Sequence, residues 1–419
     1  MFLERSIAVS VILVIFIALL PALTVVSSLS LNVLGFGLLS GWLGTGLIAA
    51  SLLLMIRDPY WASWFGGLQQ MYRWHHGMGV LGFVLLLAHP LLLAGHYLPL
   101  DPDIAWEYLS PLNPQSTNIL GWLALIIFTL GMAATFVLHL PYGMWRRFHM
   151  LLVIAIALGL GHIWSVSGFS ISLTAALLPA LISVGWRLLR ADRGIGARPY
   201  EVSAVDHPAE DITEVNLRPL ARPISIAPSQ FVSAAFFEGP HFQGCGDFHP
   251  YTVSHIAKDG SLTLSIKALG DCTQHIQSLE PGVAVRLQGP YGNFLLDRPI
   301  APEVWNAAGV GLTPFLALLR SQTLTQHTDM FYVHRESESV PYEEELQMFA
   351  TNQALLCFHS LSMTNDLTLL FTWLENIDKL NKKQVYLCGP PPFMAKVTKW
   401  LREHDMPGQQ IHFEQFDFR

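Results

Sequence analysis

WHHGMGVLGFVLLLAHP (74–90) and FHMLLVIAIALGLGHIW (148–164) are the two stretches that decide the fold. Both are apolar runs with a histidine near either end, and these four residues are His75, His89, His149 and His162. Ionisable side chains inside lipid are rare and usually functional. A neutral imidazole is also a good axial ligand for haem iron. The two stretches therefore predict two helices that hold two stacked haems, each gripped by one imidazole from either helix.

The first pair of histidines has a spacing that suits an α-helix. His75 and His89 are fourteen residues apart, which is about 40° short of four full turns. The two side chains therefore share one helix face, about 21 Å apart along the axis. His76 is the alternative for the inner position, and His75 is preferred because it gives the better facial match.

The second pair does not share one face of an ideal helix. His149 and His162 are thirteen residues apart, which leaves roughly 140° between them. This spacing predicts local unwinding, and Gly159 and Gly161 lie where it would occur. A lone histidine in a membrane helix more often bonds to a neighbour than to a metal. Two pairs at similar spacing favour ligation.

The composition divides the chain into two parts. Of its 419 residues, 52% are hydrophobic and 13% are charged, which is too apolar for one soluble globule. The apolar excess ends near residue 190, and nearly all acidic residues follow it. We therefore predict a membrane half and a water-soluble half. The net charge of −7 argues against nucleic acid as a partner.

All cysteines lie in the second half, without the spacing of a metal site: Cys245, Cys272, Cys357 and Cys388. We expect them to be reduced, cytosolic thiols.

Six hydrophobic stretches are long enough to cross a bilayer core of about 30 Å. They are residues 6–27, 33–56, 74–95, 119–138, 148–165 and 171–189. The first is interpreted as a retained helix, because its apolar run is too long for a signal peptide and lacks a convincing cleavage site. The chain is thus expected to be a multi-pass protein of the cell membrane, in contact with lipid.

Charges in the loops predict the orientation. Arginines follow the second, fourth and sixth stretches, whereas the loop after the third has no Lys or Arg and carries Asp101, Asp103 and Glu107. Positive loops stay in the cytoplasm, which places both termini and the soluble half there. The His75–His149 pair would then lie at the inner end and the His89–His162 pair toward the outside. The acidic outer loop is expected to attract metal cations.

The soluble half changes pattern once. From residue 199 to about 297, short alternating runs between Gly, Pro and Asp turns predict an antiparallel barrel. From residue 304, strands alternate with helical stretches, which predicts βαβ units and a parallel sheet. The expected protein has three domains: an all-α six-helix transmembrane bundle (1–192), an antiparallel β-barrel (193–299) and an α/β parallel-sheet nucleotide domain (300–419).

Two turns in the last domain indicate a bound nucleotide. AAGVGLTPFLALL (307–319) places glycines between a strand and a helix, where a pyrophosphate can approach backbone N–H groups. A tight turn without a ligand is the alternative. LCGPPPFM (387–394) places Cys388 and Gly389 at another strand end, the edge where such sheets bind ligands. An ordinary proline-rich turn is the alternative there.

These features, in this order, resemble the ferric reductase and NADPH oxidase superfamily over nearly the whole chain. The resemblance implies FAD, two b-type haems and NADPH or NADH as cofactors. HPYTVS (249–254) is similar to the family's flavin signature. By this match the residues that line the isoalloxazine ring are His249, Pro250, Tyr251 and Thr252. Thr252 or Ser254 would hydrogen-bond its N5 edge.

The resemblance assigns roles to further residues. Lys267 and Thr273, in SIKALGDCT, would hold the FAD pyrophosphate, and GPYG (289–292) would close the barrel. Residues that match the family's nucleotide turn are Gly309, Gly311, Thr313 and Pro314, with Ala308 and Val310 as mild departures. Residues that match the turn beside the nicotinamide are Cys388, Gly389 and Pro390. Arg335, after a strand, would pair with a 2′-phosphate and so favours NADPH, while NADH stays open.

The C-terminal FEQFDFR resembles endings in which an aromatic ring shields the flavin. Phe416 would take this role, with Glu414 beside the transfer site. The implied catalytic residues are Thr252, Cys388, Glu414 and Phe416.

The resemblance implies a transmembrane oxidoreductase that passes electrons from cytosolic NAD(P)H through FAD and two haems to an acceptor outside. Ferric iron or another metal is the first expectation. One alternative is an NADPH oxidase that reduces O2 to superoxide; another is an electron-donor subunit for a partner protein at the outer face. Leu93 stands where oxidases carry a further histidine, and the next histidine is His96. This departure argues against the oxidase.

Overall fold

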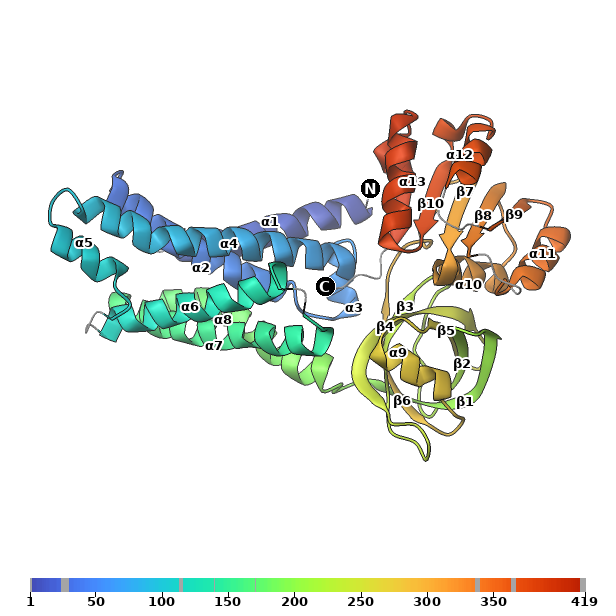
Figure 1. The fold of residues 1–419 in the computed structure, drawn as a ribbon, viewed down its shortest axis with the longest axis horizontal. Coiled ribbons are helices and arrows are strands. Elements are labelled where there is room, and N and C mark those ends of the chain that lie inside the picture. The colour runs from blue at the N-terminus through green and yellow to red at the C-terminus, as the bar shows by residue number, and fades with distance from the viewer. Residues whose placement is uncertain are drawn as a thin grey trace. The chain divides into compact units, whose positions relative to one another are not determined.

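The computed structural model describes residues 2–23, 30–112, 116–138, 140–169, 171–335, 340–362 and 367–414. The chain divides into two units by its internal contacts. One comprises Met1–Ile56 with Gln70–Arg187, and the other Arg57–Gln69 with Leu188–Arg419. The first unit is helical, and the second holds a barrel and a parallel sheet (Figure 1).

The helical unit is built from long apolar helices that lie alongside one another (Figure 1). They are α1 (Phe2–Leu23), α2 (Val33–Leu53), α4 (Leu68–Tyr97), α6 (Ser116–Phe136), α7 (Tyr142–Ser167) and α8 (Ile171–Trp186). Helices satisfy their own backbone polar groups, which is what a lipid environment requires of a spanning segment.

Four of the six predicted spans are confirmed by length and apolarity, namely those in α2, α4, α6 and α7. The α8 helix has 16 residues, about 24 Å at 1.5 Å per residue, and is short for a bilayer core. It continues as a π-helix, Arg187–Asp192, which brings charges to its end. In α1, side chains are described only from Ile12.

The predicted unwinding at Gly159 and Gly161 is wrong. The α7 helix is α-helical from Tyr142 to Ser167. The physical reason is that an apolar helix retains its own hydrogen bonds, since freed carbonyls would find no water in lipid.

Two short helices were not predicted. They are α3 (Pro59–Trp64) and α5 (Pro102–Leu109), and each begins with an aspartate followed by proline. Asp101 accepts the backbone N–H of Asp103 at 3.0 Å, as N-cap aspartates do. This carboxylate of the predicted acidic outer loop therefore caps a helix.

The predicted antiparallel barrel is confirmed. Its strands are β1 (Arg198–Ala209), β2 (Ile212–Pro219), β3 (Phe231–Phe236), β4 (Cys245–Ile256), β5 (Leu262–Lys267) and β6 (Ala284–Tyr291). They close in the order β1-β2-β5-β4-β3-β6, and β1 pairs with β6. Apolar residues from every strand fill the interior, among them Val215, Val253 and Leu287. Closure leaves no unpaired sheet edge. A short helix, α9 (Asp271–His275), follows β5.

The expectation of four reduced thiols is wrong for two of them. Cys245 at the start of β4 and Cys272 in α9 form a disulfide with a Cα–Cα separation of 5.6 Å. They are separated by 27 positions in the chain, and the antiparallel pairing of β4 with β5, which α9 follows, brings them together. Cys357 and Cys388 are free.

The predicted parallel sheet is also confirmed, in the order β11-β10-β7-β8-β9. Its strands are β7 (Glu303–Ala308), β8 (Thr328–His334), β9 (Leu356–Ser362), β10 (Gln384–Cys388) and β11 (Ile411–Glu414). On one face pack α12 (Thr368–Glu375) and α13 (Pro391–Glu403), and on the other α10 (Thr313–Ser321) and α11 (Glu343–Asn352). Residues alternate between the faces, so Val304 meets one core and Trp305 the other.

A charged cluster joins the barrel to the sheet domain. Arg320 on α10 meets Glu214 on β2 at 2.8 Å and Glu345 on α11 through two bonds of 2.8 Å. The Arg320 and Glu214 side chains are each only 15% exposed. The carboxylates raise the pKa of Arg320 against the opposing effect of its burial.

We predict that Arg320→Ala lowers the free energy of unfolding by about 2–4 kcal/mol. The loss is smaller than for a fully buried pair, because some exposure remains, yet two carboxylates lose their partner. Arg218→Ala is the matched control: its pair with Glu201 is exposed, with Arg218 at 63%, and it should lose at most about 1 kcal/mol. Thermal unfolding of the full chain measures both, and equal losses would contradict the prediction.

Candidate functional site

The α2 and α4 helices contact each other at three levels, and successive levels are seven residues apart on both helices. Glycine carbonyls and small residues of α2 meet histidines and a glycine of α4. A Cβ added to Gly44 would lie 3.0 Å from the Gly82 carbonyl oxygen, and one added to Gly82 would lie 3.1 Å from that of Gly44. The contacting pairs are Gly37 with His89, Gly44 with Gly82, and Ser51 with His75. Close approach of this kind needs small residues on both helices.

This register fixes both imidazoles of α4 by the same bond. His75 Nδ1 lies 3.0 Å from the Ser51 carbonyl oxygen, and His89 Nδ1 lies 2.7 Å from that of Gly37. A carbonyl partner requires Nδ1 to carry the proton, which leaves Nε2 as the basic nitrogen. Metal-binding histidines have this arrangement, in which the outer hydrogen bond sets tautomer and ring direction.

His75 of α4 and His149 of α7, the pair predicted to bind the inner haem, lie close to each other. The rings of His75 and His149 have centroids 6.3 Å apart, and His149 Nδ1 lies 3.2 Å from Thr135 Oγ1. Two imidazoles that share one metal ion at about 2 Å per bond have centroids roughly 6 Å apart. The separation therefore fits an axial pair on one iron. His76 lies beside Phe136, with ring centroids 6.5 Å apart.

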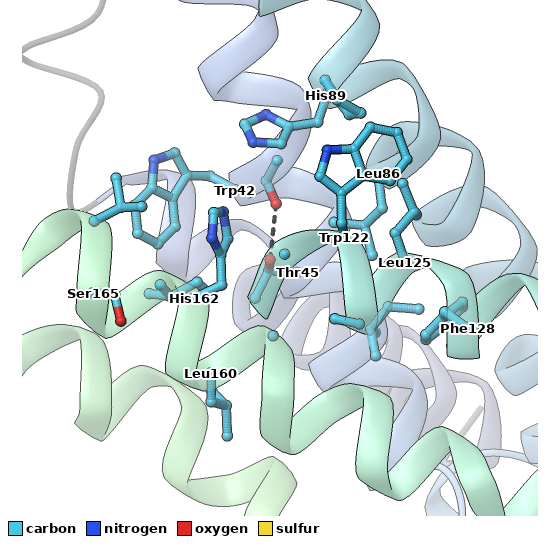
Figure 2. A pocket seen from close by; sticks show the side chains of 18 of the residues that line it. Trp42, Thr45, Leu86, His89, Trp122, Leu125, Phe128, Leu160, His162 and Ser165 are labelled. Carbon is cyan, nitrogen blue, oxygen red and sulfur yellow. Dashed lines mark hydrogen bonds between the residues drawn. The ribbon is translucent and has the colours of Figure 1, made fainter. Parts of the chain in front are cut away.

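The outer histidines face a cavity of about 650 Å³ within the helical unit. Figure 2 shows His89 and His162 directed into it, with Trp42 and Trp122 on its walls. Ligand sites typically measure about 300–1,000 Å³ and are mostly apolar. The size, the apolar walls and two convergent imidazoles fit a haem.

Two glycines make room for the outer imidazoles. A Cβ on Gly41 would lie 2.8 Å from His89 Nδ1, and one on Gly121 would lie 3.0 Å from His162 Nδ1. Neither glycine was predicted from the sequence as part of the site. The signal was the small-residue spacing on α2, in which Gly37 and Gly41 are four positions apart.

The short α5 helix forms part of the wall of this cavity. Its Ile104, Glu107 and Tyr108 line the cavity wall. Tyr108 stacks on Tyr97 with ring centroids 5.4 Å apart, and its carbonyl accepts the indole N–H of Trp122 at 3.1 Å. Leu93, where oxidases carry a further histidine, also lines the cavity.

The flavin-signature residues lie on β4. Tyr251 packs in the barrel core against Phe236, and burial raises its pKa. Thr252 pairs with Phe231 of β3, while Pro250 and His249 pair with Ser233 and Ala234. The Ser254 hydroxyl donates to the Thr263 carbonyl at 3.2 Å and lies 3.4 Å from Glu214. Ser254 thus belongs to the polar cluster around Arg320.

The predicted pyrophosphate residues lie on β5 and α9. Lys267 pairs with Asp211 at 3.0 Å and reaches the Gly309 turn, where an added Cβ would meet its Nζ at 4.0 Å. Thr273 Oγ1 accepts the backbone N–H groups of Leu269 and Gly270 at 2.8 and 2.9 Å. One ammonium therefore lies next to the nucleotide turn of the neighbouring domain.

The two predicted nucleotide turns meet at the carboxyl edge of β7 and β10. A Cβ on Gly311 would collide with the Cys388 carbonyl, and one on Gly389 would lie 2.8 Å from the Ala308 side chain. Thr313 and Pro314 begin α10 and are buried, and Pro390 precedes α13. The glycines therefore let the two turns pack against each other at the carboxyl edge of the sheet, which is the edge where such sheets bind dinucleotides.

The outermost strand brings a carboxyl group to the same edge. Glu414 pairs with Cys388 in the β10–β11 register, and a Cβ on Gly292 would lie 3.1 Å from its Oε1. Its Oε2 is buried without a hydrogen-bond partner among the described residues. Burial raises the pKa of Glu414 to about 8. Burial, with the Glu414 charge, raises the pKa of Cys388 well above its usual value.

Two residues predicted for the nucleotide and flavin sites are not among those that meet at the Gly311, Cys388 and Glu414 turns. Arg335 is exposed after β8, at the carboxyl edge of the sheet. Phe416 lies outside the described residues.

Comparisons with known proteins match both halves of the chain. Residues 40–160 match the family described as "Ferric reductase like transmembrane component", and residues 307–399 match "Oxidoreductase NAD-binding domain". The electron transfer component of 2-halobenzoate 1,2-dioxygenase from Burkholderia cepacia is 30% identical over 140 residues, covering 30% of this chain and 41% of that protein. The flavohemoprotein of Pseudomonas aeruginosa is 26% identical over 261 residues, covering 55% and 60%.

The chain thus spans between two fifths and three fifths of the length of these relatives. Among solved structures, flavohemoglobin from Malassezia yamatoensis aligns with a TM-score of 0.50 and 17% identity, covering 93% of this chain and all of that one. This last likeness concerns the fold alone.

We predict that stability falls as pH rises from about 5 to 8 because of Glu414. Its pKa in the folded chain, about 8, lies above the 4.5 of the free side chain. The folded state therefore holds an extra proton in this window, and ionisation costs up to a few kcal/mol. Glu414→Gln, which stays neutral, should flatten the dependence of Tm on pH. An unchanged slope in this variant would show that other groups cause it.

Proposed function

We propose that this chain is a membrane oxidoreductase, because residues 40–160 match the ferric reductase-like transmembrane family and residues 307–399 match the oxidoreductase NAD-binding family. It takes electrons from NAD(P)H through FAD and two b-type haems to an acceptor on the outer side. The acceptor is ferric iron or another metal. The observation that carries the proposal is the α2–α4 register, which holds His75 and His89 by Nδ1 and leaves both Nε2 atoms available.

The helical unit would supply four ligands. His75 with His149 would hold an inner haem, and His89 with His162 an outer one in the cavity of about 650 Å³. The α2 carbonyls fix the tautomer and the ring direction of the α4 imidazoles, so the ligand geometry would be set before a haem binds. The apolar walls would surround a bound haem with few polar groups.

The second unit would bind the nucleotides. The packed turns at Gly311 and Gly389 would form the edge against which the dinucleotide binds, and Lys267, next to Gly309, would place positive charge beside its phosphates. Neutral Glu414 holds a proton on its carboxyl group at pH 7 beside Cys388. When bound, flavin accepts a hydride and releases single electrons, which haem iron carries one at a time.

The proposal includes an orientation and a domain division. Arginines after the second, fourth and sixth apolar stretches favour a cytoplasmic location for the flavin and nucleotide domains. The division into residues 1–192, 193–299 and 300–419 is part of the same proposal, with Arg335 as the residue that favours NADPH and Phe416 as the flavin shield.

The purified full chain tests the function. Under anaerobic NADPH, we expect two haems per chain to become reduced, followed by reduction of a ferric chelate. His89→Ala and His162→Ala should each lose about half of the haem and the ferric activity, because each removes one ligand of the outer site. His96→Ala, on the same helix, is the control. A full haem complement in the first two variants would refute the ligand assignment.

The same preparation separates the alternatives. NADPH-driven cytochrome c reduction that superoxide dismutase abolishes would identify an oxidase, which the apolar Leu93 in the cavity wall disfavours. Activity that appears only on adding a partner protein would identify a donor subunit.

The helix register gives a second prediction. Gly82→Val should lower the content of both haems, because its side chain would push against the Gly44 carbonyl and separate α2 from α4. Gly79→Val is the control, because a Cβ on Gly79 meets nothing within 4 Å. Absorbance of haem per chain measures both, and equal loss in the two variants would contradict the role of the register.

A further inference from the structure

The Cys245–Cys272 disulfide links two segments that carry predicted flavin contacts. Cys245 begins β4, four residues before His249 of the flavin signature. Cys272 lies in α9 directly before Thr273. The bond therefore ties the signature strand to the turn that would face the pyrophosphate.

Two neighbouring side chains surround the sulfur atoms. A ring nitrogen of His249 lies within 4.8 Å of both sulfurs. Tyr251 Oη lies 3.8 Å from Cys272 Sγ. Both belong to the flavin signature, so the cysteine pair lies in direct contact with this motif.

The surroundings suit a bond that forms and breaks. Both cysteines are partly buried, and each lies next to an exposed residue, Gly246 and Asp271, so the pair is near the surface of the barrel. An imidazole beside a thiol takes up its proton and raises the reactive thiolate fraction. In the cytoplasmic location proposed above, disulfides are transient and regulatory rather than structural.

We propose that Cys245 and Cys272 form a reversible thiol–disulfide site that controls how tightly the barrel holds FAD. The inference rests on the proposed flavin site. The oxidised pair holds the α9 turn against β4 before FAD binds, so less ordering remains to oppose binding. The reduced pair releases the turn and weakens FAD affinity.

The chemical step uses a peroxide as oxidant. One cysteine thiolate attacks hydrogen peroxide, which gives a sulfenic acid and hydroxide; His249 takes up the thiol proton and returns it to form water. The second thiol attacks the sulfenic sulfur and releases a second water. In total, two thiols and one H2O2 give one disulfide and two waters. A small dithiol reverses the bond by exchange.

The test measures thiols and FAD separately on the full chain in detergent. After treatment with dithiothreitol or with H2O2 followed by catalase, intact mass after maleimide labelling counts the thiols. FAD titration of flavin-stripped protein gives the Kd in each state. The variants are Cys245→Ser and Cys272→Ser, and Cys357→Ser, a free cysteine of the sheet domain, is the matched control.

We expect peroxide to remove two maleimide sites from the native chain and from Cys357→Ser, and to tighten FAD binding by about threefold to tenfold. In Cys245→Ser and Cys272→Ser, FAD affinity should not respond to peroxide. A disulfide that forms without changing the Kd would overturn this inference alone. No FAD binding in either state would overturn the proposed function as well.

The remaining outcome of the test is zinc binding, because the two thiolates and His249 are also suitable zinc ligands. Zinc that stays on the reduced chain through dialysis and blocks disulfide formation would overturn the inference and assign these side chains as metal ligands.

Discussion

The hydrogen bonds from α4 imidazoles to α2 carbonyls are the constraint on which the membrane half depends. A backbone carbonyl has two lone pairs, and its helix uses one. Ser51 and Gly37 each offer the other to a histidine of the neighbouring helix. In an apolar environment a polar ring without a partner is costly, so the same bonds that stabilise the histidines also direct them. Glycines at the crossing let the two backbones come near enough.

The sequence predicted those features that depend on periodicity and composition. Long apolar runs became helices, alternating runs became a closed barrel, and strand–helix alternation became a parallel sheet. The four histidines were identified because polar residues stand out in apolar segments. The turn glycines at Gly311 and Gly389 were identified because each lies in a turn between a predicted strand and a predicted helix.

Features that depend on distant segments could not be predicted. Nothing local in Cys245 or Cys272 indicates a partner 27 positions away. The Arg320 cluster likewise needs three elements from two domains. The prediction that α7 unwinds was wrong because it considered only the ideal helix angle between His149 and His162. In the structure α7 is continuous, and the two rings contact α6, His149 at Thr135 and His162 at Gly121. The N-cap of α5 could have been predicted from the local sequence Asp101–Pro102, but this loop was interpreted only from its negative charge.

The distance along the helix axis between His75 and His89 depends on α2 as well as on α4, because each histidine bonds to a carbonyl of α2. Contacts recur every two helical turns on each helix, at Gly37, Gly44 and Ser51 and at His89, Gly82 and His75. A single inserted residue between two of these levels would rotate everything beyond it by about 100° and turn one imidazole away from its carbonyl. The distance between the two histidine levels can therefore change only if both helices gain or lose the same seven-residue segment.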